Sequence, residues 1–215
     1  MRKITARYKA LKSHKVFHLQ LFTGILLFAV SLFFNNLANN YTAEHFENGI
    51  SDIILDHLPT MNVGYIFLEG VIILIAFITL LSFHKPARIP FILKSMALFI
   101  LTRAFFISLT HLGIPLHQAA IHPESLLERT IYGSGEDLFF SGHTGFPFLM
   151  AMIFWDVKIT RIIFLLTSVF FGVAVLLGHL HYSIDVFSAF FITYGIYHMA
   201  VWLFKKDYQL FQESA

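Results

Sequence analysis

Residues 63–83 have the sequence VGYIFLEGVIILIAFITLLSF, an apolar run in which Glu69 is the only charged residue. The hydrocarbon core of a bilayer is about 30 Å thick, and a helix needs roughly 20 apolar residues to cross it. Inside that core, backbone polar groups find hydrogen-bond partners only within a helix or a closed barrel. This stretch therefore predicts a transmembrane helix, and it indicates that lipid is the solvent for much of the chain.

Five further stretches approach the length of a span. They are residues 16–34, 91–112, 145–155, 162–178 and 184–204, and the shortest, 145–155, is extended backwards by Phe139 and Phe140. The composition agrees, because 57% of the 215 residues are hydrophobic and 13% are charged, whereas soluble domains carry about 25% charged residues. We therefore expect an all-α integral membrane bundle of six transmembrane helices.

The basic residues predict the orientation of this bundle. Thirteen of the 15 Lys and Arg residues fall in the two tails or at the second and fourth connections, whereas Arg103 and Arg129 fall in the other half. Lys and Arg are held on the cytoplasmic side of membranes, so both termini are predicted to be cytoplasmic. The expected organisation is a basic cytoplasmic tail at 1–15, a six-helix membrane catalytic domain at 16–204, and a cytoplasmic tail at 205–215.

Several classes of site are disfavoured by composition. There is no cysteine, which excludes disulfides, thiolate metal sites and cysteine nucleophiles. The net charge of +2 is too small to argue for nucleic acid. The first outside connection, 35–61, carries apolar residues near one helical face, which predicts an amphipathic helix lying in the interface plane or packed on the bundle. These apolar residues are Phe46, Ile50, Ile53, Ile54 and Leu58.

Residues 179–185, HLHYSID, contain a histidine and an acid four positions apart at the predicted outer end of the last span. On a helix, His181 and Asp185 would share one face. A carboxylate there could bond one ring nitrogen and present the other as a nucleophile or base. The pair could equally be a simple helix cap, but ionisable groups at membrane depth favour a functional interpretation.

Residues 141–144, SGHT, and Arg103 fall at the same predicted boundary. Ser141 and Gly142 at a helix start would expose backbone N–H groups to a phosphate oxygen, and His143 beside them could protonate a leaving alkoxide. Arg103 suits bidentate phosphate contact. The alternatives are plain N-capping by Ser141 and snorkelling of Arg103 to the interface. Together the three clusters indicate phosphoryl transfer, which needs positioning, charge neutralisation and proton transfer but here no metal.

Other polar residues leave alternatives open. Glu69 is a proton relay, a partner of Arg103, or a carboxyl hydrogen-bonded between helices, and Glu124 and Glu128 are candidate pocket acids by position alone. His111, His117 and His122 with His179 would be possible metal ligands, but their spacing matches no compact ligand pattern. We therefore expect no metal and no cofactor.

These motifs resemble those of the sphingomyelin synthase family, within the wider type-2 phosphatidic acid phosphatase superfamily, and they also resemble inositol phosphorylceramide synthases. DLFFSGHT at 137–144 is similar to the second active-site motif of that family, and HYSIDV at 181–186 to the third, with Ser183 where Thr is usual. The stretch from Arg103 to Pro115 is similar to a motif at the end of the third helix. A weaker likeness is His57-Leu58-Pro59, and the resemblance spans roughly residues 50–205.

The resemblance implies a six-helix core and a phosphohistidine mechanism. In it, His181 attacks the phosphorus of a phospholipid, Asp185 orients and stabilises His181, and His143 protonates the departing lipid hydroxyl. Arg103, Ser141 and Gly142 would bind phosphate oxygens. The supporting residues would be Asp137, Glu136 and Tyr182. The expected partners are a phospholipid donor and a lipid alcohol or water as acceptor, at an active site on the non-cytoplasmic face of an integral, multi-pass protein.

Departures from the family pattern leave the head group and the acceptor open. Gly135-Glu136 replaces the usual Cys-Gly, and Leu180 replaces the acid between the two histidines of the third motif. The expected function is transfer of a phospho-head group to a ceramide- or diacylglycerol-like lipid alcohol. The alternatives are a lipid phosphate phosphatase of the same superfamily and, outside catalysis, a lipid transporter or lipid-binding scaffold. A transporter would more often show paired helix interruptions and internal symmetry, which are absent from the sequence.

Overall fold

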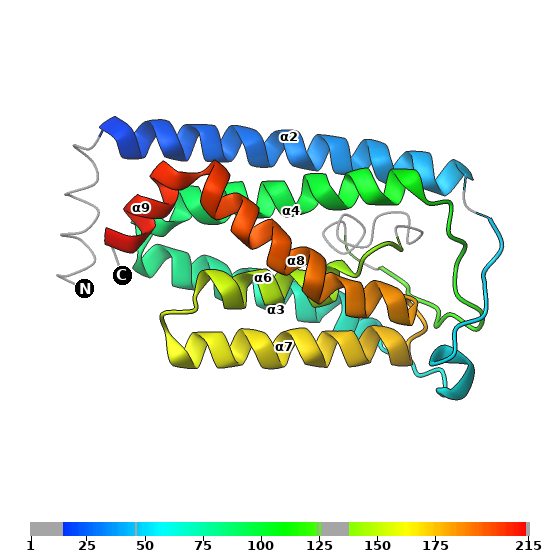
Figure 1. Ribbon diagram of the computed structural model, residues 1–215. Helices are drawn as coiled ribbons and strands as arrows, with labels where there is room; N and C mark the ends of the chain where they lie inside the picture. Colours follow the sequence, from blue (N-terminus) through cyan, green and yellow to red (C-terminus); the bar gives the residue numbers. More distant parts are fainter. Residues whose placement is uncertain (1–14, 46, 124, 126–137, 214–215) are drawn as a thin grey trace.

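The computed structural model describes residues 15–45, 47–123, 125 and 138–213 as a bundle of α-helices (Figure 1). The helices are α2 (Lys15–His45), α3 (Gly64–His84), α4 (Ile89–Leu109), α6 (Gly142–Ile153), α7 (Lys158–Leu177), α8 (Ser183–Leu203) and α9 (Lys205–Glu213). Two short 3₁₀ turns lie at Leu55–His57 and Pro86–Arg88. No strand occurs in these described ranges, and the predicted all-α class is confirmed.

Five helices are long and apolar enough to cross a membrane: α2, α3, Pro86–Leu109, α7 and α8. The predicted fourth span is different, because α6 has 12 residues and at 1.5 Å per residue reaches only roughly 18 Å. Ser141 caps its start, and the chain leaves the helix at Phe154. From α2 to α8 successive helices run in opposite directions, and α9 follows the end of α8, so the start of α2 and all of α9 lie at the same end of the bundle (Figure 1).

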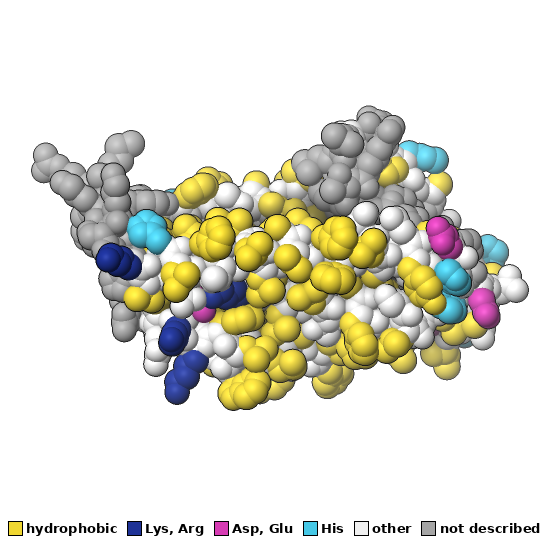
Figure 2. Space-filling view, turned by 90° about the horizontal axis from the view of Figure 1, so that it is seen from above, with side chains coloured by type: hydrophobic (Ala, Val, Ile, Leu, Met, Phe, Trp, Pro, Cys, Tyr) yellow, Lys and Arg dark blue, Asp and Glu magenta, His cyan; other side chains and the backbone are white. Residues whose placement is uncertain are grey.

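The sides of the bundle are apolar where a soluble protein would be polar. Large hydrophobic side chains are exposed along several helices, for example Phe22 on α2, Leu166 on α7 and Phe191 on α8. Figure 2 shows hydrophobic side chains along the length of one face, with Lys and Arg at one end and most of the visible acidic and His side chains at the other. Apolar surfaces of this extent mark contact with lipid or other proteins, and with five candidate spans they indicate a multi-pass integral membrane protein.

Helix α2 packs along α4 through small residues spaced seven apart. Gly24, Ser31 and Ala38 are buried on this face, and a side chain at Gly24 would contact Pro90 and Leu93. Small residues allow membrane helices to approach closely. The predicted end of this helix at Asn35–Asn36 is wrong, because α2 continues to His45. The four asparagines between 35 and 40 do not end the helix, because Ala38 among them still packs against Ala104 and Ile107 of α4.

The amphipathic helix expected in the first outside connection does not form in its described part, residues 47–63. The chain there is irregular apart from the Leu55–His57 turn, where Asp52 accepts hydrogen bonds from the N–H groups of Ile54 and Leu55. Gly49 and Gly113 let this connection cross the 110–123 connection at backbone contact distance, since a Cβ at either position would clash with a carbonyl oxygen of the other strand of chain. This connection is therefore held by contacts with the 110–123 connection and not by the hydrogen bonds of a helix.

The HLHYSID residues, 179–185, form the tight turn between α7 and α8 and the first residues of α8. His179 has a positive φ of 50°, its N–H donates to the carbonyl of Leu176, and the N–H of Leu180 donates to that of Val175. This is the Schellman arrangement, in which glycine is the usual left-handed residue. The imidazole of His179 lies within hydrogen-bonding distance of the carbonyl oxygens of Leu116 and Leu58, so its side chain fastens two outside connections to the turn.

Two ion pairs, one between a buried and an exposed side chain and one buried on both sides, hold the opposite end of the bundle. Arg88 is wholly buried and donates to both carboxylate oxygens of Asp156, at 3.2 and 2.6 Å, and its guanidinium lies 4.2 Å from the ring centroid of Phe211. Lys94 donates to both oxygens of Asp207, each at 2.9 Å. Residues on α4 and its preceding turn therefore bind both α9 and the α6–α7 connection.

We expect Asp156→Asn to lower the free energy of unfolding by about 1–2 kcal/mol, because it leaves the buried Arg88 without its charged partner, while the 37% exposure of the Asp156 side chain lets water screen part of the interaction. Burial alone would raise the pKa of Asp156, but hydrogen bonding and charge from Arg88 outweigh it and hold that pKa below its ordinary value. The stabilisation is therefore complete at neutral pH and is lost as pH falls through the lowered pKa. Unfolding midpoints in detergent at pH 7 and at acid pH measure both effects.

The double variant Asp156→Asn with Arg88→Met is the control, because it removes the buried charge together with its partner. We expect it to recover part of the loss. An Asp156→Asn midpoint equal to that of the wild type at neutral pH would contradict the prediction.

Candidate active site

A cavity of about 330 Å³ lies among α2, α3, α4, α6 and the turn before α8. Its polar lining residues are Asn35, Asn39, Arg103, Gly142, His143 and His181. His181 lies in the turn before α8, and the other five lie toward the end of their helix at which that turn lies, whereas apolar lining residues such as Phe28, Leu74 and Met96 lie further along the helices. The cavity therefore has a polar end and an apolar length.

His181 is 4% exposed and lines the polar end. Its Nδ1 lies 2.8 Å from the carbonyl oxygen of Leu138. Since a carbonyl oxygen only accepts, Nδ1 carries a proton, and the tautomer with this single proton has its lone pair on Nε2. No described residue forms a hydrogen bond with Nε2. The structure thus presents this nitrogen as an available base or nucleophile in a cavity.

Asp185 is wholly buried beside His181, with 3.6 Å between its Oδ2 and Nδ1 of the imidazole. That separation is beyond a good hydrogen bond, so the carbonyl of Leu138 orients the ring while Asp185 contributes negative charge. The carboxylate also accepts from the backbone N–H of Tyr182 at 3.0 Å, and its Oδ1 has no hydrogen-bond partner among the described residues. The group that orients the ring is therefore a backbone carbonyl, which cannot be recognised from residue type.

A second carboxylate supports the start of α8 from the first outside connection. Oδ2 of Asp52 accepts from the backbone N–H of Ser183 at 2.7 Å. Burial raises the pKa of Asp52, but hydrogen bonds from Ser183, Leu55 and Ile54 outweigh it and lower the pKa below its ordinary value. Asp52 therefore stays ionised at neutral pH, where a negative charge at a helix amino end is stabilising.

His143 lies on the first turn of α6 and faces the cavity. Its Nε2 lies 3.0 Å from the carbonyl oxygen of Phe67, and its ring stacks on that of Phe67 at a centroid distance of 3.7 Å. The carbonyl accepts, so Nε2 carries a proton. These two contacts with α3 orient the ring against the cavity wall.

Arg103 also reaches the polar end, and its Nε donates to the carbonyl oxygen of Phe140 at 3.0 Å. Gly142 leaves room for it, because a Cβ at that position would already lie 3.4 Å from Nε and 3.8 Å from Cζ. The guanidinium therefore lies against the amino end of α6, where two sources of positive potential combine to favour an anion.

The structure brings Arg103, Gly142, His143 and His181 together at the cavity. Two other predicted site residues, Ser141 and Tyr182, do not line it. Ser141 is wholly buried, and its hydroxyl accepts from the N–H of Thr144, as an N-cap does. Its own N–H donates to the carbonyl of Asp185, which joins the starts of α6 and α8.

The Tyr182 side chain links the connection before α3 to the connection after α4. Its hydroxyl donates to the carbonyl of Gly113 at 2.8 Å and accepts from the N–H of Ile50 at 3.0 Å. Burial raises the pKa of Tyr182, so the phenol stays protonated and keeps both bonds. The other two predicted supporting residues, Glu136 and Asp137, lie outside the described residues, as do Glu124 and Glu128.

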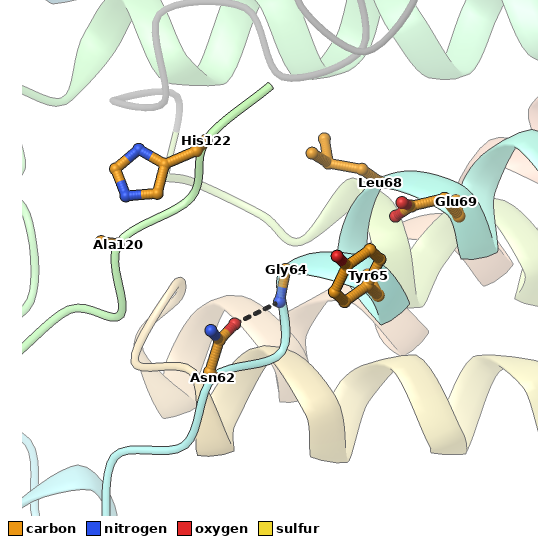
Figure 3. Close-up of a pocket in the computed structure, with 7 residues that line it drawn as sticks. All are labelled: Asn62, Gly64, Tyr65, Leu68, Glu69, Ala120 and His122. Atoms are coloured by element: carbon orange, nitrogen blue, oxygen red, sulfur yellow. Dashed lines mark hydrogen bonds between the residues drawn. The ribbon is translucent and has the colours of Figure 1, made fainter. Parts of the chain in front are cut away.

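Glu69 lines a second cavity of about 200 Å³, not the one that holds Arg103. In Figure 3, Glu69 and Tyr65 project from α3, while Ala120 and His122 belong to the 110–123 connection. Oε2 of Glu69 is buried, and no described residue forms a hydrogen bond or ion pair with this side chain. Neither the expected pairing with Arg103 nor an interhelical hydrogen bond is therefore formed with a described residue.

The histidines considered as metal ligands have other surroundings. His111 is within 3.3 Å of the Tyr41 hydroxyl, and both ring nitrogens of His179 face backbone carbonyls. In the part of the chain that the structure describes, no three His, Asp or Glu side chains are grouped as a metal site.

Sequence reasoning missed four contributors to the site. Leu138 and Phe67 act through backbone carbonyls, which leave no signal in residue type. Asn35 and Asn39 were available as a signal, since their spacing of four places both on one helical face. The first span was instead predicted to end before Asn35, which placed both residues in the connection that follows it.

Residues 135–202 match the family model of the PAP2 superfamily C-terminal domain. The match includes α6, α7 and most of α8, and with them His143, His181 and Asp185. It supports the wider superfamily that the motifs suggested, and in general terms it indicates a lipid phosphatase or phosphotransferase acting on lipid phosphates. A comparison with curated proteins finds no match.

Proposed function

We propose that the protein is a membrane lipid phosphotransferase. It moves a phospho-head group from a phospholipid to a ceramide- or diacylglycerol-like lipid alcohol through a phosphohistidine intermediate, as the likeness to sphingomyelin synthases implies. The observation that carries this proposal is the setting of His181. Its Nδ1 is held by the Leu138 carbonyl, and the ring lines a cavity that also contains Arg103 and His143.

The shape of the cavity supports a lipid as the substrate. A phosphate at the polar end would meet Arg103 and the amino end of α6, while acyl chains would lie against Phe28, Leu74 and the other apolar lining residues. Ligand sites are mostly apolar with a few placed polar groups. The basic residues gather at the opposite end of the bundle, so we place this site at the non-cytoplasmic face.

In the first step, Nε2 of His181 attacks the phosphorus, and the bond between phosphorus and the lipid alkoxide breaks. His143 donates a proton to the departing oxygen through its ring nitrogen Nδ1, while Nε2 remains held by the Phe67 carbonyl. The phosphorylated imidazole retains the Nδ1 proton and becomes cationic, and Asp185 at 3.6 Å offsets that charge. Arg103 neutralises charge on the phosphoryl oxygens throughout.

In the second step, the hydroxyl of the acceptor lipid attacks the same phosphorus as the P–N bond breaks. His143, now neutral at Nδ1, takes the proton of that hydroxyl, and His181 returns to its starting form. One residue therefore serves as acid and then as base, and atoms and protons balance over the two steps.

The test is lipid-product mass spectrometry on purified protein in liposomes. With phosphatidylcholine and ceramide, we expect diacylglycerol and a phosphocholine-bearing ceramide in equal amounts, both absent from His143→Ala protein. Phosphate release from phosphatidic acid without head-group transfer would instead establish the phosphatase of the same superfamily, with water as the acceptor. Folded protein that turns over neither substrate would contradict the enzyme and favour a transporter or scaffold.

A further inference from the structure

Helix α2 contributes two asparagines to the polar end of the cavity, and neither belongs to the motifs that suggested the function. Asn39 is 8% exposed, and Asn35 lies one helical turn before it. Leu32 and Phe28 continue the same face toward the apolar part of the cavity. Their neighbours Asn36 and Asn40 are exposed and do not line the cavity.

Among the described residues, the amide of Asn39 has no hydrogen-bond partner. Its Oδ1 is buried without one, and within the described residues no hydrogen bond to either cavity asparagine is found. The side chain cannot simply turn to solvent, because α2 is held against α4 on both sides of it: Ala38 packs with Ala104 and Ile107, and the Thr42 hydroxyl lies 3.4 Å from the Ile107 carbonyl. An unpaired buried acceptor is unfavourable, so a ligand that donates to it would be selected.

We propose that Asn39, with Asn35 one turn away, recognises a hydrogen-bond donor in the interfacial region of the acceptor lipid and thereby selects acceptors of the ceramide type over diacylglycerol. This proposal rests on the function proposed above. The pair acts as a specificity determinant, and it does not exchange protons with the reacting atoms.

The proton inventory of the acceptor decides between the two lipid classes. The reacting hydroxyl must give its proton to His143, so that proton is not available to Oδ1 of Asn39. A diacylglycerol has no second donor, because its remaining polar groups are esters that only accept. A ceramide has two more, an amide N–H and a secondary hydroxyl. Only a ceramide-like acceptor therefore satisfies Asn39 while its reacting hydroxyl faces the base.

The length of the helix face agrees with this placement. Asn39 and Asn35 are separated by roughly 6 Å along the helix axis, so the donors of one lipid can reach Asn39 while its chains pass Asn35. Phe28 and Leu32 follow where its chains would begin. A lipid aligned with α2 would thus meet amides first and apolar side chains next.

The test compares acceptors in competition. We expect wild-type protein to transfer to ceramide with a kcat/KM on the order of tenfold or more above that for diacylglycerol, and Asn39→Leu, nearly equal in volume, to abolish the preference by lowering ceramide turnover. Asn40→Leu on the exposed face is the matched control and should keep it. Equal acceptor ratios in wild-type and Asn39→Leu protein, or a wild-type preference for diacylglycerol, would overturn the proposal.

A binding measurement separates this proposal from the function on which it rests. In His181→Ala protein, where no turnover is expected, ceramide in mixed micelles should raise the unfolding temperature more than diacylglycerol does, and adding Asn39→Leu should remove the difference. That result supports recognition by Asn39 even if no acceptor is turned over. Equal stabilisation by both lipids would reject it, whatever the activity of the wild-type protein.

Discussion

Replacement of His181 by alanine is expected to reduce kcat for head-group transfer on the order of 10⁴-fold or more, because it removes the group that forms the covalent intermediate. The ring lies in the cavity with Nδ1 committed to Leu138, so no other nitrogen of this residue could serve. Some loss of stability is also expected, because the Leu138 carbonyl loses its hydrogen-bond donor, so the unfolding temperature should be measured beside kcat.

The intermediate itself provides the sharpest measurement. Protein mixed with donor labelled in its head group and quenched in alkali should carry label on a histidine in the wild type and none in His181→Ala. The matched control is His198→Ala, since His198 is an exposed histidine of α8, the helix that follows His181. Undiminished turnover in His181→Ala, or labelling that persists there, would remove His181 from the nucleophile's role.

Replacement of Asp185 by asparagine is expected to lower kcat by about 10²–10⁴-fold with little change in KM, because the charge of Asp185 stabilises the cationic phosphorylated ring. The wild-type carboxylate lies 3.6 Å from Nδ1 and accepts from the N–H of Tyr182. An asparagine oxygen could still accept that bond, so the variant removes charge while retaining the helix cap. Steady-state kinetics and unfolding temperature should both be measured.

Asp52→Asn is the matched control for this variant. Asp52 also accepts a backbone N–H at the start of α8, that of Ser183, but it is Asp185 whose carboxylate lies 3.6 Å from the His181 ring. Asp52→Asn should therefore alter stability more than kcat. Similar losses of activity in the two variants, each accompanied by a lower unfolding temperature, would show that Asp185 acts only by holding the start of the helix.

The membrane helices could be predicted from sequence because the signal is local. A run such as residues 63–83 has one stable form in lipid whatever surrounds it, and four of the other predicted spans also appear as long apolar helices. The fourth did not, because the length of α6 depends on where Ser141 caps it and where the chain turns at Phe154. The end of the first span was wrongly predicted at Asn35 for a related reason. A polar side chain is unfavourable on a helix face in lipid, but Asn35 borders the polar end of the cavity.

By itself, the sequence determined the chemistry available at one end of the bundle: two histidines, an acid four residues from one of them, an arginine and a helix start. The tertiary structure alone decided how these groups are used. It placed the Leu138 carbonyl closer to His181 than Asp185 is, gave Ser141 to capping, and turned Asn39 into the cavity. The physical reason is that helix formation follows from residue type and spacing, whereas hydrogen bonds between distant segments depend on backbone positions that only packing sets.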